Sequence, residues 1–211
     1  MRKYFSLIAC FFSLHSMANE VISPYILQTG KDLNPLVLLA DKNTFKFTVW
    51  NLETDKSVYQ SIMATGKIIG NKTKEGDKKT PEGIYLLTST LSRADLDEMY
   101  GTKITIYYGK GALVTNYPNP VDLLQNKTGS GIWIHSRDDE SRLNRKYDSN
   151  GCVLIKNNGI TFLQNNFKAH ELPLIITSHD KKNNKFIKAS LEKIYSLQKK
   201  WQEVDLNLRY Y

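Results

Sequence analysis

Short runs of apolar residues, separated by polar turn residues, recur through most of the chain and predict β-strands. Segment 45–51 shows the pattern most clearly, because Phe45, Phe47 and Val49 fall on one face of an extended chain. Similar runs predict strands at 36–39, 45–51, 58–64, 84–90, 104–108, 112–115, 131–135, 152–155 and 174–177. Many short strands with few helices favour a mainly β fold with a sandwich or barrel-like core.

Three segments carry helical patterns instead. Residues 92–100 and 157–166 predict short helices, the second with Asn157 or Asn158 as its N-cap. In the tail, apolar residues recur at steps of three and four from Ile187 to Leu208, which predicts an amphipathic helix within 179–211. Residues 66–83 are rich in Gly, Lys, Asp and Pro and are expected to form a loop between two strands.

The amino-terminal residues have the layout of a secretory signal peptide. Basic Arg2 and Lys3 precede a mostly apolar run, and Ser16 and Ala18 place small residues at a cleavage site. That run is too short to span a bilayer. We therefore expect a leader at 1–18, a lead-in at 19–34, a domain at 35–178, and a periplasmic protein without a membrane span. A lipid anchor at Cys10 is disfavoured because almost no apolar run precedes it.

Composition and charge narrow the picture. The chain has 211 residues, 41% of them hydrophobic and 24% charged, which excludes a disordered, collagen-like or polytopic membrane protein. Its net charge of +8 becomes +6 without residues 1–18, and 181–211 hold eight basic and three acidic residues. The excess charge is therefore mostly in the tail. It fits a helix packed on the domain or on a partner better than a nucleic-acid surface.

Loss of the leader would leave Cys152 as the one remaining cysteine. It cannot form an internal disulfide, so it is either a small buried hydrophobe or a reactive thiol. Its neighbours favour the thiol, because an apolar run ends at His135 and Gly151 directly precedes the cysteine. An imidazole can take a thiol proton, and a glycine lets backbone N–H groups approach a reacting carbonyl. Alone, a His and a Cys seventeen residues apart are a weak signal.

A wider pattern resembles a known family. His135 followed by the run Ser-Asn-Gly-Cys-Val at 149–153 is similar to the active-site signature of the L,D-transpeptidases, bacterial enzymes acting on peptidoglycan stem peptides. The segment 76–85 resembles the loop-and-strand motif of the same domain. Segments 116–122 and 129–135 resemble one branch, which includes L,D-carboxypeptidases that set helical cell shape. The resemblance covers about 35–178 and implies a β-sandwich or barrel-like catalytic domain.

The resemblance implies roles for four residues. Cys152 would be the nucleophile and His135 its general base, the N–H groups of Gly151 and Cys152 would form an oxyanion hole, and Ser149 would line the site. The thiolate would attack the carbonyl of the third stem residue and expel the terminal D-alanine. An amine acceptor would complete a transpeptidation and water a carboxypeptidation. A third possibility is a non-catalytic peptidoglycan-binding scaffold that kept the fold.

Two positions depart from the pattern of many family members. Ser136 stands where glycine is common, and Leu154 stands where an arginine is common. The missing arginine favours the trimming branch, and Arg137, Arg142 and Arg145 are candidates to bind a substrate carboxylate in its place. They could equally form a solvated surface loop. The remaining candidates for substrate binding are Ser136 and Tyr117, and Tyr117 could instead belong to the core.

The sequence gives little indication of a cofactor, a metal site or further partners. His170 and His179, taken with His135 and Cys152, match no compact zinc motif, and Asp138 to Glu140 lack the pattern of a calcium loop. We expect no cofactor and no metal. The tail, whose Trp201 and Tyr210 resemble the start of a small pocket domain found in the cell-shape branch, could contact other cell-wall or shape proteins. Peptidoglycan stem peptides are the expected partner.

Overall fold

The computed structural model of the protein describes residues 36–51, 54–168 and 172–178. The leader, the lead-in and the tail helix expected from the sequence lie outside these residues. The described elements are β1 (Leu36–Asp41), β2 (Lys46–Asn51), β3 (Lys56–Gly66), β4 (Gly83–Ser92), α1 (Arg93–Tyr100), α2 (Thr102–Thr105), β5 (Gly111–Thr115), α3 (Pro120–Leu124), β6 (Trp133–His135), the 3-10 helix η3 (Glu140–Arg145), β7 (Tyr147–Ser149), β8 (Val153–Ile155), α4 (Asn157–Asn166) and β9 (Pro173–Thr177).

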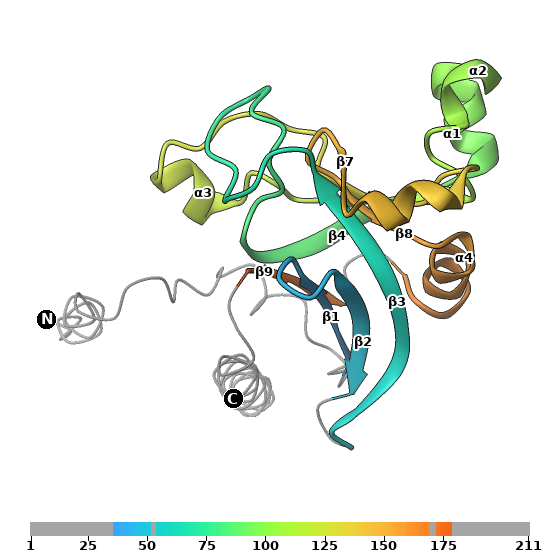
Figure 1. Cartoon of the computed structure of the whole chain (residues 1–211), viewed down its shortest axis with the longest axis horizontal. Helices are drawn as coiled ribbons and strands as arrows, with labels where there is room; N and C mark the ends of the chain where they lie inside the picture. Colours follow the sequence, from blue (N-terminus) through green and yellow to red (C-terminus); the bar gives the residue numbers. More distant parts are fainter. Residues whose placement is uncertain (1–35, 52–53, 169–171, 179–211) are drawn as a thin grey trace, which may run out of the picture.

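The strands form one sheet that closes on itself (Figure 1). Their order is β2-β1-β9-β4-β5-β6-β8-β3-β7, and β2 also pairs with β3. This last pairing joins the two ends of an eight-strand ring and leaves β7 as an addition to β3. The mainly β, barrel-like fold expected from the sequence is therefore confirmed.

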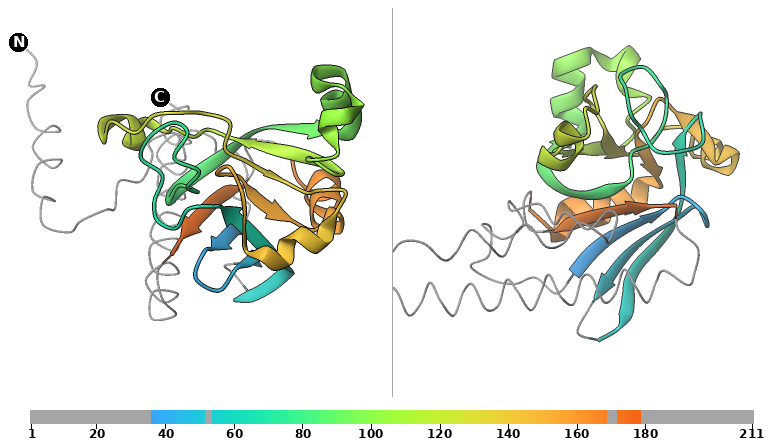
Figure 2. Two further views of the ribbon diagram at one scale, coloured as in Figure 1. Left: turned by 45° about the horizontal axis from the view of Figure 1, so that its top comes forward. Right: turned by 90° about the vertical axis from the view of Figure 1, so that its left-hand side faces the viewer.

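The interior of the ring is filled by alternate residues of the strands. Leu38, Phe47 and Ile134 come from different strands and belong to one fully buried cluster. Helix α4 adds Ile160 and Leu163 to the same cluster, so it packs against the ring. Figure 2 shows α1 and α2 on one side of the ring and α3 on another. No helix of the described residues is long and apolar enough to cross a bilayer.

The strand expected at 104–108 is wrong. Residues 102–105 form α2, and a turn follows in which the N–H of Tyr108 donates to the carbonyl of Thr105 at 2.8 Å. The side chain of Thr105 also donates to Asp97 of α1. These contacts stabilise a helical turn that the β-branched run did not predict, and they leave Ile104 and Ile106 about half exposed. Helices α3 and η3 were also not expected.

Two features of the fold position the site. Strands β6 and β8 are parallel neighbours, with Ile134 opposite Val153 and His135 opposite Leu154. In addition, the loop between β3 and β4 lies beside the segment through α3 (Figures 1 and 2), where the N–H of Thr128 donates to the carbonyl of Thr73 at 3.1 Å. The ends of β6 and β8 therefore meet two loops from distant parts of the sequence.

Candidate active site

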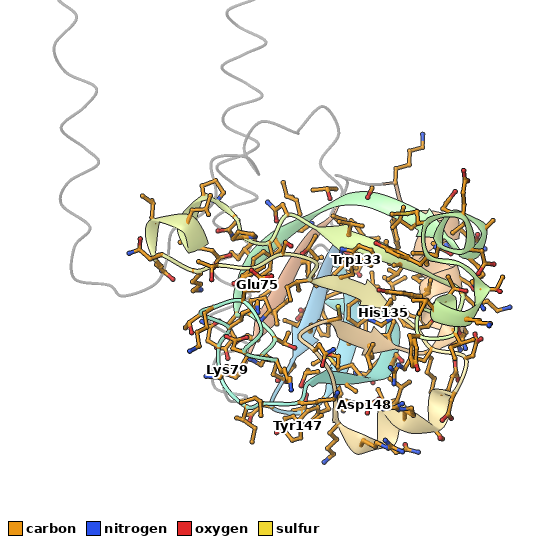
Figure 3. All side chains as sticks on the ribbon, turned by 90° about the horizontal axis from the view of Figure 1, so that it is seen from above. Glu75, Lys79, Trp133, His135, Tyr147 and Asp148 are labelled. Carbon is orange, nitrogen blue, oxygen red and sulfur yellow. The ribbon has the colours of Figure 1, made fainter. Side chains whose placement is uncertain are left out.

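Cys152 and His135 lie on the same face of two neighbouring strands. Cys152 directly precedes β8, and the register places it opposite Trp133, two residues before His135. Side chains two residues apart on a strand share a face, and adjacent strands are about 4.8 Å apart. The register therefore puts the thiol and the imidazole diagonally across one strand pair. Figure 3 shows Trp133 and His135 next to one another on β6.

Ser149 shapes the turn that carries the cysteine. Its Oγ accepts a hydrogen bond from the N–H of Gly151 at 3.0 Å and donates to the carbonyl of Cys152 at 2.6 Å. Gly151 has φ +136, a conformation that side chains rarely adopt, and a Cβ there would lie 3.0 Å from the carbonyl oxygen of Lys79. The N–H of Gly151 thus already has an acceptor, which leaves the N–H of Cys152 as the remaining oxyanion-hole candidate from the sequence analysis.

The thiol of Cys152 is placed between a backbone acceptor and a backbone donor. Sγ lies 3.3 Å from the carbonyl oxygen of Gly131, and the N–H of Trp133 hydrogen-bonds to it. Burial raises the pKa of the thiol to about 11, while the Trp133 N–H and the charge of Lys72 act in the opposite direction. The resting group at neutral pH is therefore a thiol rather than a preformed thiolate.

The hydrogen bonds of His135 fix its tautomer. Nδ1 lies 2.8 Å from the carbonyl oxygen of Ser136, which can only accept, so Nδ1 carries the proton of the neutral ring. Nε2 then holds the lone pair that can accept a proton. Burial lowers the pKa of His135 to about 4, and the charge of Arg137 acts in the same direction, while hydrogen bonds to the backbone of Ser136 and Tyr107 act against it. The imidazole is accordingly neutral, and competent as a base, over most of the pH range.

The lowered pKa predicts a loss of stability in acid. The unfolded chain binds a proton at a pKa near 6.5 and the folded chain only near 4, so stability falls as the pH drops between these values. The expected loss is roughly 3 kcal/mol by pH 4. Urea unfolding at stepwise lower pH measures it. The variant His135→Asn, which has no such group, should show a correspondingly smaller decrease, and an equal decrease in both proteins would contradict the assignment.

Aromatic rings form a wall beside the histidine. The ring centroid of Tyr108 lies 5.0 Å from that of His135 and 5.6 Å from that of Trp133. Tyr100, from the end of α1, stacks on Tyr108 at 5.9 Å and is 42% exposed. These side chains make one apolar side of the site. Tyr100 and Tyr108 were not expected there, because the sequence placed Tyr108 in a strand.

The three candidate arginines converge on one carboxylate. Arg137, Arg142 and Arg145 lie 2.8, 2.6 and 3.7 Å from oxygens of Asp148, whose side chain is 4% exposed. The group ties the segment after His135 to β7, which leads into the Ser149 turn. The Nε atoms of Arg137 and Arg142 are buried without a hydrogen-bond partner among the described residues. Binding of a substrate carboxylate by these arginines stays a prediction.

Two other candidates are buried in structural positions. Ser136 is 0% exposed, and its Oγ accepts from the N–H of Lys110 at 2.9 Å and donates to the carbonyl of Tyr108 at 3.2 Å. Tyr117 belongs to the main core cluster and donates from its hydroxyl to the carbonyl of Thr128 at 3.1 Å. Both positions favour a structural role, in which Ser136 contributes its carbonyl to His135. Leu154 is buried with Ala64 and Leu143.

The loop between β3 and β4 closes the other side of the site. Figure 3 labels two of its residues, Glu75 and Lys79. Lys67 donates from its backbone N–H to the carbonyl of Ser149 at 2.8 Å and from Nζ to Asn150 at 3.3 Å. Only its part from residue 76 onward belongs to the segment that resembles a family motif, and no residue of the loop was expected to have a role. Among the described residues, no cluster of three His, Cys, Asp or Glu side chains could hold a metal ion, and His170 and His179 lie outside them.

The ring of strands and the diagonal cysteine–histidine pair define a β-barrel domain with a Cys–His site. A family model described as the L,D-transpeptidase catalytic domain, YkuD, matches residues 35–176, and the chain belongs to this family. The resemblance stated from the sequence is confirmed. No curated protein matches the chain.

Two solved structures are similar in sequence as well as in fold. The helical cell shape determining protein Pgp2 from Campylobacter jejuni is 28% identical with a TM-score of 0.55, covering 74% of this chain and 55% of that one. Bd1075 from Bdellovibrio bacteriovorus is 31% identical with a TM-score of 0.56, covering 83% of this chain and 61% of that one. This chain therefore spans less than two thirds of the length of either protein.

Proposed function

We propose that the protein is a periplasmic enzyme that cleaves peptidoglycan stem peptides by cysteine acyl transfer. The observation that carries the proposal is the placement of His135, whose Nδ1 is held by the Ser136 carbonyl so that Nε2 can serve as a base on the face that carries Cys152. Membership of the L,D-transpeptidase catalytic domain family supports the substrate class. The similarity to a cell shape determining protein supports a role in cell shape.

The first half-reaction forms a thioester. Nε2 of His135 takes the proton of the Cys152 thiol as Sγ attacks the carbonyl carbon of the third stem residue, and the carbonyl oxygen becomes an oxyanion. When this intermediate collapses, the bond to the nitrogen of the terminal D-alanine breaks. The imidazolium returns the proton to that nitrogen, so D-alanine leaves as an amine and the acyl group stays on Sγ.

The raised thiol pKa and lowered imidazole pKa make proton transfer part of the attack. Neither group is charged at rest near neutral pH, since the thiol pKa is about 11 and the imidazole pKa about 4. Charge separation therefore occurs only when the thiol attacks a bound carbonyl. Burial disfavours this charge separation, whereas fixed N–H donors stabilise it, because their dipoles need no reorganisation as charge develops.

Water is the acceptor that we propose for the second half-reaction. Nε2 of His135 takes a proton from water as its oxygen adds to the thioester carbon. The C–S bond then breaks, the imidazolium returns the proton to Sγ of Cys152, and the tripeptide leaves as an acid that ionises in water. Leu154, which occupies a position where many relatives carry arginine, is buried in an apolar cluster and offers no cation to an acceptor strand. An amine acceptor, which would give a cross-link, is the alternative.

Replacing Cys152 by alanine is expected to abolish the reaction, because no thiol is then present to form the thioester. Purified muropeptides are incubated with the wild type and with Cys152→Ala, and the products are identified by mass spectrometry. We expect the wild type to convert tetrapeptides into tripeptides with release of D-alanine, and Cys152→Ala to leave them intact.

Two other results would change the conclusion. Formation of new dimers cross-linked between third stem residues, if it depends on Cys152, would show that the protein is a transpeptidase rather than a carboxypeptidase. Equal products from both proteins, or no products from either, would contradict the enzyme and favour a peptidoglycan-binding scaffold. Binding of the intact muropeptide to Cys152→Ala, measured by calorimetry, then distinguishes a scaffold from a protein that does not recognise this substrate.

A further inference from the structure

One buried cation near Cys152 has no role in the chemistry described above. Lys72 belongs to the loop between β3 and β4, and its side chain is 4% exposed. Its Nζ donates to Oδ1 of Asp77 at 2.9 Å and to the carbonyl of Lys74 at 3.0 Å. These two contacts hold the ammonium group in one place. A buried charge is screened by salt and water far less than an exposed one.

Asp77 organises the loop that presents Lys72. Its second carboxylate oxygen accepts from the N–H groups of Thr73 at 2.8 Å and Lys74 at 3.1 Å, and Oδ1 also accepts from the N–H of Lys79 at 3.1 Å. Burial alone would raise the pKa of Asp77, but these donors and Lys72 lower it well below its usual range. The carboxylate therefore stays charged and fixes both the loop and its lysine.

The contacts of Lys72 lead directly to the cysteine. A Cβ atom at Gly129 would lie 3.3 Å from Cε of Lys72, so the lysine packs on the backbone of that glycine. Two residues further on, Gly131 provides the carbonyl oxygen that lies 3.3 Å from Sγ of Cys152. The neighbouring segments are also joined, because the N–H of Glu75 donates to Oγ1 of Thr128 at 3.0 Å. The backbone of residues 129–131 thus links the side chain of Lys72 to the acceptor of the Cys152 thiol.

The other cations near the site are less suited to act on the thiol. Lys67 contacts the exposed side of the turn at Asn150, where solvent screens its charge. The arginines near His135 surround Asp148. Among the described residues, the charged or titratable groups that interact electrostatically with Cys152 are Lys72 and Tyr108, and His135 lies diagonally across the strand pair. Lys72 is the one among them that favours negative charge at Sγ.

We propose that Lys72 is a positioning residue of the acyl transfer, whose buried ammonium, fixed by Asp77, stabilises the negative charge that develops on Sγ of Cys152 as its proton moves to His135. The inference rests on the proposed function for its meaning in catalysis. The proposal adds a functional residue outside the cysteine–histidine pair. It also means that the loop between β3 and β4 contributes a positive charge near Cys152.

The chain offers a closely matched control. Lys127 and Asp122 form a second buried pair, with a distance of 2.7 Å and exposed fractions of 8% and 4%, against 4% and 6% for Lys72 and Asp77. Both pairs are five residues apart in sequence. No interaction joins Lys127 to Cys152 among the causes that shift the thiol pKa. Removing either lysine leaves a buried aspartate without its cationic partner, so the two changes should lower the free energy of unfolding by similar amounts.

The test compares Lys72→Met with Lys127→Met in the full-length protein. Iodoacetamide labelling of Cys152 is followed by mass mapping of its peptide over a pH series below the thiol pKa. We expect Lys72→Met to slow labelling about threefold to tenfold at each pH, because loss of the ammonium raises the pKa of the thiol and lowers the fraction of Cys152 present as thiolate. Lys127→Met should stay within about twofold of the wild type. Because Lys72 also holds the loop beside the site, the series is then extended through the thiol pKa. Loss of the ammonium raises the pH midpoint of labelling, whereas displacement of the loop changes the rate without moving that midpoint.

A second pair of variants keeps the test decisive if the methionine variants unfold. Lys72→Gln and Lys127→Gln remove the charge but keep an amide donor for the aspartate, and circular dichroism verifies their fold. Equal labelling in Lys72→Gln and wild type would overturn the proposal. Labelling needs no turnover, so the two proposals fail separately. If the wild type turns over substrate but labelling of Cys152 does not depend on Lys72, the role of Lys72 is refuted. If labelling depends on Lys72 but the wild type shows no turnover, the enzymatic function is refuted.

Discussion

Exchange of His135 for asparagine should lower kcat by about two to four orders of magnitude, the range expected for loss of a general base. Asparagine can still donate a hydrogen bond to the carbonyl of Ser136, which lies 2.8 Å from Nδ1 in the wild type, but it has no atom that replaces Nε2 as a base. Steady-state release of D-alanine from a defined tetrapeptide measures the effect. The expected loss is in kcat, with KM changed little, because the imidazole acts on the proton rather than on substrate binding.

The pH profile of the wild type provides an independent measurement of the same role. Since the pKa of His135 is about 4, kcat/KM should remain level on the acid side until the pH approaches that value. A profile that fell with a pKa near 6.5 would show that the catalytic imidazole is solvated, in conflict with its burial. Unchanged kcat in His135→Asn would remove the residue from the mechanism.

A single methyl group at Gly151 should disable the site through the backbone. Alanine there must adopt φ +136, and its Cβ would meet Cδ1 of Ile132 at 2.9 Å and the carbonyl oxygen of Lys79 at 3.0 Å. We expect a destabilisation of about 1–3 kcal/mol from the strained conformation alone. The turn must also shift, and it carries Cys152. Turnover should therefore fall by more than the stability change explains.

The matched control for this change is Gly101→Ala. Gly101 has φ +78, but a Cβ atom there would have no neighbour within 4 Å. Both variants incur the cost of an unfavourable φ, whereas only Gly151→Ala creates contacts and displaces the cysteine. Thermal unfolding should show a lower Tm for both, by about 2–4 °C per kcal/mol, and D-alanine release should be lost only in Gly151→Ala. Full activity in a folded Gly151→Ala protein would show that the turn geometry is not critical.

Sequence reasoning predicted the local structure well where alternation decides it. The strand around Phe47 follows from the apolar alternation, and helix α4 has the expected bounds. The expected N-cap was wrong, because Lys156 occupies that position rather than Asn157 or Asn158. It failed at 104–108, because the β-branched and aromatic residues there favour a strand in isolation, while contacts with α1 and the turn at Gly109 hold the segment as a helical turn. Tertiary contacts outweighed local propensity.

Some residues of the candidate site could likewise be predicted from the sequence, and others could not. The resemblance to the family pointed to Cys152 and His135, and the register of β6 and β8 places them on one face. The partner of the three arginines is Asp148, which nothing in their spacing indicated. Lys72 lies in the loop expected at 66–83, outside the family motif at 76–85, and the sequence indicated no role for it. Its burial depends on Gly129, more than fifty residues away in the sequence, and such contacts arise only when distant loops meet.

The parallel pairing of β6 and β8 explains why the histidine and the cysteine are so far apart in the sequence. Two parallel neighbours cannot be joined by a tight turn, so the chain must leave the end of β6, cross over and re-enter at the start of β8. The seventeen-residue interval is the length of that crossover, and it contains η3 and β7. Its exposed side, around Asn144, is a place where insertions can accumulate over evolution while the ladder between the two strands keeps the reacting groups in register.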